Sequence, residues 1–211
     1  MIRYQLALLG HSQRWLPPSF AFVVVLAILY PDAGAPVMPE FAVSAGALTV
    51  VACWLTIALI DAEDPVQRLI TRVHARGLSR LFGGVVVAVL ACCAALTVVS
   101  LTWSSMRHGG EPAGDLEFGV LAHLAGACTG LAIGLPCSRL LLPRIGYTVL
   151  TALAALVVVL LVRWIPLLNP LLRAMSSDTP AAGPMVLSVV SSVLVLAVSA
   201  TGVAYVHQRR G

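Results

Sequence analysis

The residue types that most often bind metals or act as nucleophiles are present, but their spacing does not build a site. The five cysteines lie inside apolar runs, and an odd number of buried thiols is not a disulfide framework. Cys92 and Cys93 point about 100° apart on a helix, and His123 and Cys128 also diverge. No C-x-x-C or H-x-x-x-H pattern occurs. We therefore interpret the cysteines as small apolar residues and predict no metal site. They are Cys53, Cys92, Cys93, Cys128 and Cys137.

All 13 basic residues are arginine, and this excludes several activities. The phosphate-binding loop of ATPases and GTPases needs a lysine, and so does Schiff-base catalysis. Intramembrane proteolysis needs a serine in G-x-S-G or a zinc motif H-E-x-x-H, and neither pattern occurs. Phospholipid transferases need several aspartates on facing helices, whereas all nine acidic residues lie outside the interiors of the apolar stretches. We predict that the chain is not an enzyme and binds no cofactor itself.

One apolar stretch combines a histidine with a regular series of small residues. Ala122, Gly126, Gly130 and Gly134 recur at every fourth position, which places them on one face of a helix. Such a ladder lets a second helix approach closely, so we predict a tight helix contact there. His123 lies in the same helix, and an intramembrane histidine is a candidate polar residue of a transport pathway. The alternative is a histidine that is hydrogen-bonded to a neighbouring helix or lies near the headgroups.

The stretch from Asp61 to Arg80, DAEDPVQRLITRVHARGLSR, is the most highly charged in the chain. Asp64 suits a helix N-cap, Pro65 the first helical position and Gly77 a C-terminal cap, so a helix over residues 64–77 is predicted. Its apolar face is Val66, Leu69, Ile70 and Val73, and its basic stripe is Arg68, Arg72, Arg76 and Arg80. This amphipathic helix either docks onto a partner or binds anionic headgroups, and its chemistry does not separate the two.

The chain that carries these residues is too apolar to be a water-soluble protein. Hydrophobic residues make up 59%, charged residues 10%, and the mean hydropathy is +0.96, whereas soluble domains carry about 25% charged residues. A helix needs about 20 apolar residues to cross a bilayer. We predict an all-α integral membrane protein with one transmembrane domain over residues 1–211. The six predicted spans are Leu16–Ala35, Phe41–Ile60, Leu81–Trp103, Phe118–Cys137, Tyr147–Leu168 and Met185–Val206.

The arginines orient these spans. With a cytoplasmic N-terminus, ten arginines fall on the cytoplasmic side, and only Arg107, Arg163 and Arg173 fall outside. This distribution follows the positive-inside rule, so the net charge of +4 does not indicate nucleic-acid binding. We expect a multi-pass protein of the cell membrane with its N- and C-termini in the cytoplasm.

Two segments outside the spans are also predicted to lie against the membrane. Residues 1–15 are amphipathic and suit a helix in the cytoplasmic interface, with a frayed terminus as the alternative. A signal peptide that ends near Ala35 is a rival interpretation of the first span, disfavoured by the long region before its apolar core. Residues 166–184 carry four prolines among apolar residues. Because a solvated loop would not contain PLLNPLL, we predict an external hairpin that re-enters the outer leaflet.

This order of elements resembles the permease subunits of the type-2 class of ABC exporters. The resemblance covers the whole chain: an interfacial helix, six spans, an amphipathic helix after the second span and an external hairpin before the sixth. Asp61–Arg80 looks like that class's coupling helix, which inserts into a cleft of the ATPase, and Pro166–Leu172 looks like its external hairpin. The chain departs at Glu63–Val66, EDPV, where many members have an acidic residue followed by Gly-Thr.

The resemblance implies how the chain would function. It would form a translocation pathway with a second permease subunit, identical or related, and would couple to a separate ATPase subunit that holds ATP and Mg²⁺. Val66, Leu69, Ile70 and Val73 would enter the ATPase cleft, and Arg68, Arg72 and Arg76 would face acidic ATPase surface or lipid phosphates. An apolar pathway would suit a lipophilic or amphipathic cargo such as a drug, a peptide or a lipid-like molecule.

Two other classes of function stay open on the sequence. A non-transporting membrane scaffold or an immunity protein would work without an ATPase. A small intramembrane enzyme would need a catalytic arrangement outside the motifs named above. An ATPase that associates with the chain would separate the transporter from both alternatives.

Overall fold

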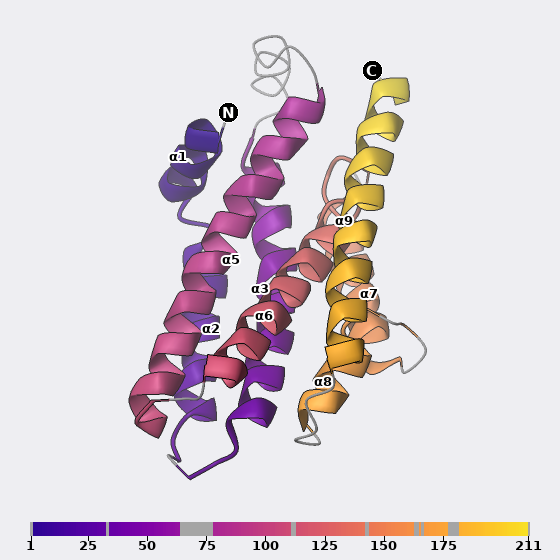
Figure 1. The fold of residues 1–211 in the computed structure, drawn as a ribbon. Coiled ribbons are helices and arrows are strands. Elements are labelled where there is room, and N and C mark those ends of the chain that lie inside the picture. Colours follow the sequence, from indigo (N-terminus) through magenta and orange to yellow (C-terminus); the bar gives the residue numbers. More distant parts are fainter. Residues whose placement is uncertain are drawn as a thin grey trace.

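The computed structural model shows a bundle of helices (Figure 1). It describes residues 2–32, 34–63, 78–110, 113–141, 144–162, 165, 167–176 and 182–210. In these ranges all regular secondary structure is helical, which confirms the predicted all-α class. The helices there are α1 Ile2–Ser12, α2 Leu16–Leu29, α3 Val37–Ala62, α5 Leu78–His108, α6 Ala113–Gly134, α7 Ile145–Leu161, α8 Asn169–Ser176 and α9 Ala182–Arg210.

The protein is a multi-pass membrane protein by the length and composition of its helices. Within the described ranges, α3, α5, α6 and α9 are each long and apolar enough to cross a bilayer. The pair α1 and α2 passes the same test only when taken together, and it is bent by 79°. The apolar helix α7 has 17 residues and is shorter. The described chain therefore has four or five candidate spans, where the sequence predicted six.

Prolines explain why two helices end before their predicted spans do. α2 ends at Leu29, and Tyr30 leaves the helical conformation with φ −103° and ψ 47° directly before Pro31. α6 ends at Gly134, two residues before Pro136. Proline lacks the N–H that a helix needs and disfavours the helical conformation of the residue before it. Between these helix ends and the ends of the predicted spans, Asp32 is the only charged residue, so a count of apolar residues overestimated both spans.

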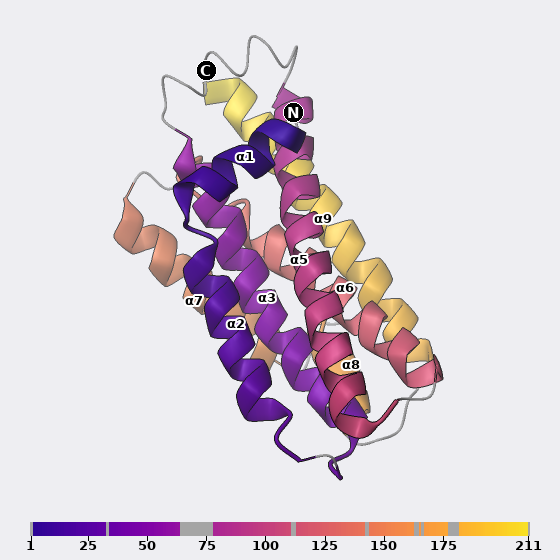
Figure 2. The ribbon, with the colours of Figure 1, turned by 90° about the vertical axis from the view of Figure 1, so that its left-hand side faces the viewer.

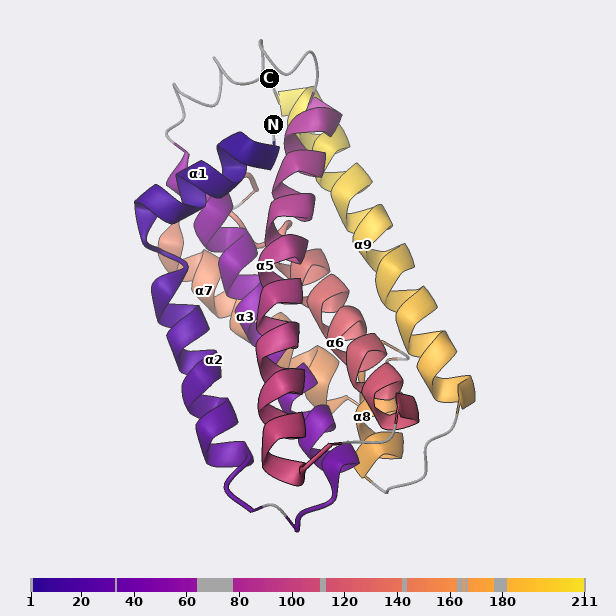
Figure 3. The ribbon, with the colours of Figure 1, turned by 60° about the vertical axis from the view of Figure 1, so that its left-hand side comes forward.

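α3 and α6 form the centre of the bundle. The long helices differ in the buried share of their most apolar 18 residues. It is 67% for α3 and 61% for α6, but only 33% for α5 and 22% for α9. Figures 2 and 3 show α2 and α5 beside α3, and α9 along the other side of α6. α8 packs its buried Leu171 and Met175 into a cluster with Phe41 of α3. The faces of α9 and α7 that carry exposed valines and leucines are the ones suited to lipid.

The ladder of small residues on α6 lies directly against α3. A Cβ built at Gly126 would lie 2.7 Å from the nearest backbone oxygen of α3. At Gly130 it would collide with the carbonyl oxygen of Thr49, and at Gly134 it would lie 2.7 Å from Cβ of Thr56. Both threonines donate their hydroxyls to carbonyls one turn back in α3, which leaves small surfaces toward α6. The two backbones therefore touch along three turns.

Two ends of the bundle can be defined from the chain. The terminal end carries α1, the last turn of α3, the first turn of α5 and the end of α9 (Figure 1). The distal end carries the turn between α2 and α3 and the end of α5. The predicted amphipathic helix, residues 64–77, lies outside the described residues. The predicted hairpin, residues 166–184, is described only in part, and that part contains α8.

Candidate functional site

Two clusters of buried polar side chains interrupt the apolar core, one at each end of α3. Polar groups inside a membrane are costly unless they are paired, which makes both clusters candidates for function. The distal cluster joins the C-terminal end of α2 to α3, α5 and α6, and its four members are at most 1% exposed. They are Tyr30, Ser44, Ser100 and His123.

His123 uses both ring nitrogens in hydrogen bonds. Nδ1 lies 2.7 Å from the carbonyl oxygen of Gly119, and Nε2 lies 3.1 Å from Oγ of Ser44. Because a carbonyl oxygen only accepts, the proton of the neutral ring is on Nδ1, and Nε2 is an acceptor toward the Ser44 hydroxyl. The single proton of that hydroxyl is shared between Nε2 and the carbonyl oxygen of Phe41, which lies 3.2 Å from Oγ. The edge of the ring packs against Phe41 with 6.3 Å between centroids. His123 of α6 is thereby tied to α3.

The chain of hydroxyls continues from Ser44 to α2 and α5. Tyr30 donates its hydroxyl to Oγ of Ser44 at 3.4 Å, and Oγ of Ser100 lies 3.3 Å from the same hydroxyl. Because Tyr30 has a single proton to donate, Ser100 is the donor in the second bond. These distances exceed the usual 2.7–2.8 Å of O–H···O bonds by about 0.5 Å, so each bond is weak. Together they connect four elements of the fold.

Charged residues close the distal end of the bundle. Nε2 of His108 lies 3.5 Å from Oε2 of Glu40, and each side chain is 7% exposed. Arg107 donates from Nε to the carbonyl oxygen of Tyr30 at 3.1 Å and from Nη2 to that of Pro31 at 2.8 Å. A cation on the last carbonyls of a helix offsets the negative end of its dipole. The end of α5 is therefore fastened to both α2 and α3.

The distal cluster can hold helices together but offers no surface to a ligand. Ser44 beside His123 has the residue types of a nucleophile and its base. Both side chains are 0% exposed, so no substrate atom reaches the hydroxyl in this conformation. The group behind the imidazole is the backbone carbonyl of Gly119 rather than a carboxylate. The arrangement is a buried hydrogen-bond network without access for a substrate.

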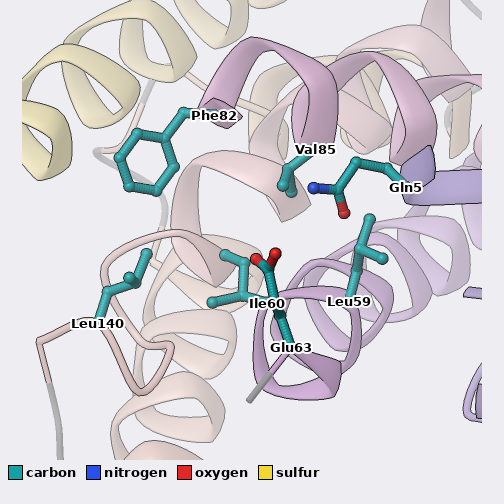
Figure 4. A pocket seen from close by; sticks show the side chains of 7 residues that line it. All are labelled: Gln5, Leu59, Ile60, Glu63, Phe82, Val85 and Leu140. Atoms are coloured by element: carbon teal, nitrogen blue, oxygen red, sulfur yellow. The ribbon is translucent and has the colours of Figure 1, made fainter. Parts of the chain in front are cut away.

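The terminal cluster is built around a small cavity (Figure 4). Gln5 of α1 and Glu63 at the end of α3 point into the same space, and they are 1% and 7% exposed. The volume is about 10 Å³, which is the lower limit for one water molecule. The remaining lining residues are apolar and come from α3, α5 and the turn after α6. They are Leu59, Ile60, Phe82, Val85 and Leu140.

The two polar residues of this cavity differ in their partners. The hydroxyl of Tyr4 donates to Oε1 of Glu63 at 3.2 Å, which ties α1 to the end of α3. Nε2 of Gln5 has no hydrogen-bond partner among the described residues. A buried amide without a partner destabilises the folded state by about 1–3 kcal/mol. Among the described residues, the terminal cluster therefore contains an amide nitrogen without a partner, whereas each member of the distal cluster has one.

The last turn of α3 is also bound by two turns that are remote in sequence. Arg14, between α1 and α2, donates from Nη1 to the carbonyl oxygen of Asp61 at 3.0 Å. The carboxylate of Asp61 accepts the backbone N–H of Arg139 at 3.2 Å, and Nε of Arg139 lies 3.6 Å from its second oxygen. Arg139 lies in the turn after α6. Three separate elements thus contact the residues that lead into the segment 64–77.

The residues that the sequence singled out are distributed over different places. The predicted docking residues, between 66 and 76, lie outside the described residues. His123 is in the distal cluster, and the ladder that begins at Ala122, itself 0% exposed, faces α3. In the described part of the chain no three His, Cys, Asp or Glu side chains gather in a way that could hold a metal.

The terminal cavity and the pair of Glu40 with His108 were not predicted. In the sequence, Glu63 stood out only as the start of Glu63–Val66, where the chain departs from the exporter pattern. A signal for Gln5 exists, because it stands one turn before the buried Leu9 on the same face of α1. The residues of α3 and α5 that line the cavity with it follow only from the 79° bend between α1 and α2.

The fold defines the class of the protein as a multi-pass helical membrane protein. Comparisons with protein-family models, curated proteins and solved structures found no match. Any more specific function is therefore argued from the residues of this chain and from the contacts that they make.

Proposed function

We propose that this protein is the permease subunit of an ATP-driven exporter of the type-2 ABC class. The observation that supports this best is the convergence of contacts on the last turn of α3. That turn leads into residues 64–77, where a separate ATPase subunit, holding ATP and Mg²⁺, would dock. A displacement of this segment would reach α1 through Glu63, and it would reach the turns next to Arg14 and Arg139 through Asp61.

The centre of the bundle is suited to move as one body. α3 and α6 touch backbone to backbone at Gly130, where an added Cβ would collide with α3. The distal cluster fastens α2 and α5 to the same pair through Tyr30 and Ser44. Packed cores switch between discrete arrangements rather than deforming gradually. A push at the terminal end would therefore reorient the bundle against a second permease subunit, identical or related, and open a pathway for lipophilic or amphipathic cargo.

The distribution of arginines supports an ATPase on the terminal side. The positive-inside rule assigns the end with more arginines to the cytoplasm, so we propose that both termini are cytoplasmic in the cell membrane. Among the arginines whose side chains are described, five belong to the terminal end, namely Arg3, Arg14, Arg139, Arg144 and Arg209. Two belong to the distal end, namely Arg107 and Arg173.

The test places charge on the apolar face of the segment 64–77. In the double variant Leu69→Asp and Val73→Asp, carboxylates would enter a dry contact, which costs several kcal/mol, so recovery of the ATPase should fall by more than about tenfold. The matched control Gln67→Asp and Thr71→Asp adds the same charge off the predicted apolar face and should leave recovery unchanged. The measurement is affinity purification of the tagged full chain from its native cells, with bound ATPases identified by mass spectrometry and assayed for ATP hydrolysis.

Two outcomes would contradict the proposal. If the Leu69 and Val73 variant recovers as much ATPase as the wild-type chain, this segment is not a docking element. If the wild-type chain recovers no ATPase, the protein acts without one, as a membrane scaffold or an immunity protein would. Insertion of each variant is checked first, and it should be normal because no apolar span is changed.

A further inference from the structure

A groove of about 310 Å³ lies between α3 and α7. Small residues form its floor, where Cys53 is 1% exposed and Ala152 is 6% exposed. Large apolar residues form its walls, and Trp54 and Leu153 each keep 53% of their surface exposed. Because α3 is long and apolar enough to cross the bilayer, a groove along its side opens toward lipid chains.

Positive charge stands at the terminal end of this groove. Thr148, the lining residue nearest that end on α7, donates its backbone N–H to the carbonyl oxygen of Arg144 at 3.2 Å, and Arg144 is exposed. On α3, Asp61 follows the lining residue Ile57 by one turn and holds Arg139, whose side chain is 45% exposed. Two arginines, Arg144 and Arg139, against the single carboxylate of Asp61 therefore give a net positive charge to the residues about one turn beyond this end of the groove.

The groove and its mouth have the two parts that a phospholipid needs. An acyl chain is apolar and thin, and a phosphate pairs with arginine. The exposed Tyr147 beside Arg144 is an aromatic residue of the type found at the headgroup level.

We propose that this groove binds one anionic phospholipid of the surrounding bilayer. One acyl chain lies on Cys53 and Ala152 between the walls of α3 and α7. The phosphate lies at Arg144, with Arg139 as a second contact that is shared with Asp61. The site depends only on the membrane location of the protein, and it is independent of the proposed coupling to an ATPase.

The test uses Trp54 as a reporter inside the groove. The chain has four tryptophans, and replacing Trp15, Trp103 and Trp164 by phenylalanine leaves Trp54 alone. The full chain is reconstituted in phosphatidylcholine that contains either brominated phosphatidylglycerol or brominated phosphatidylcholine, because bromine on an acyl chain quenches a nearby tryptophan. One arginine at the membrane surface attracts an anionic lipid about fivefold. We expect the anionic lipid to quench Trp54 with at least that preference.

Matched variants separate the headgroup contact from the acyl-chain contact. Arg144→Gln should abolish most of the preference, whereas Arg209→Gln, on α9 at the same end, should keep it. Ala152→Leu fills the floor and should reduce quenching by both lipids, whereas Ala154→Leu, an exposed position on the same helix, should not. Equal quenching by both lipids in the parent chain, or a preference that survives Arg144→Gln, would overturn the proposal. If neither lipid quenches Trp54, the proposal is also overturned, because protein would then cover the groove.

Discussion

The side of α3 that faces α6 and the last turn of α3 bury polar and small residues in opposite ways. Against α6, glycines bring the backbones into contact, and the polar His123 has a partner at each ring nitrogen. At the last turn, α1, α5 and the turn after α6 line a cavity together with α3, and the amide nitrogen of Gln5 has no partner among the described residues. The first region is closely packed, and the second contains unfilled space.

The difference shows which part of the helix is built for rigidity and which part tolerates movement. Close packing transmits displacement without absorbing it, whereas a void with an incomplete polar group is a local weakness. The weakness lies next to residues 64–77, where the proposed partner would act. We therefore expect mutations to lower stability strongly along α6 and moderately at the distal cluster. At the terminal cavity the changes in stability should be small, and one of them should be an increase.

The largest effect is expected from Gly130→Leu. The added side chain would meet the carbonyl oxygen of Thr49 and Cβ of Ala52, so it should destabilise the fold by more than about 3 kcal/mol. The control is Gly202→Leu on α9, because an added Cβ there meets no atom within 4 Å. Thermal unfolding in detergent and size-exclusion chromatography should show loss of the folded species for Gly130→Leu alone. Equal behaviour of the two variants would place the ladder against lipid instead of α3.

An intermediate effect is expected at the distal cluster. His123→Leu removes the hydrogen bond across α3 and α6, and Ser44→Ala leaves the Nε2 acceptor of His123 unpaired, so each should lower stability by about 1–3 kcal/mol. In the double variant the loss should be less than the sum by on the order of 1 kcal/mol. The measurement is a double-mutant cycle of unfolding midpoints. Strictly additive losses would show that the two side chains do not interact.

The smallest effect, and one of opposite sign, is expected at the terminal cavity. Gln5→Met keeps the length of the side chain and removes the amide nitrogen that has no partner among the described residues, so it should raise stability by about 1 kcal/mol. Tyr4→Phe removes the hydrogen bond to Glu63 and should lower stability by a similar amount. Unfolding midpoints of both variants in the same detergent give the comparison. A loss of stability in Gln5→Met as large as that in Tyr4→Phe would mean that the amide is satisfied by a bound water.

The helical class and most helix positions were predictable from the sequence, because a run of apolar residues this long has few other folds. α3, α5 and α9 each contain the whole of their predicted spans. The ends of α2 and α6 were less predictable, because the prolines after them act on the backbone while the apolar character continues. The ladder of small residues was visible as a face, but nothing in its spacing names α3 as the helix it meets.

The sequence by itself determined the environment of the protein, its helical class and the face of α6 that packs, because composition and helical periodicity are local properties. Only the tertiary structure decided which polar residues meet. Tyr30 and Ser100 are 70 positions apart, and Tyr4 and Glu63 are 59 apart. The first pair depends on the meeting of α2 with α5, and the second depends on the bend between α1 and α2. Both depend on the packing of all the helices at once, which no single stretch of sequence encodes.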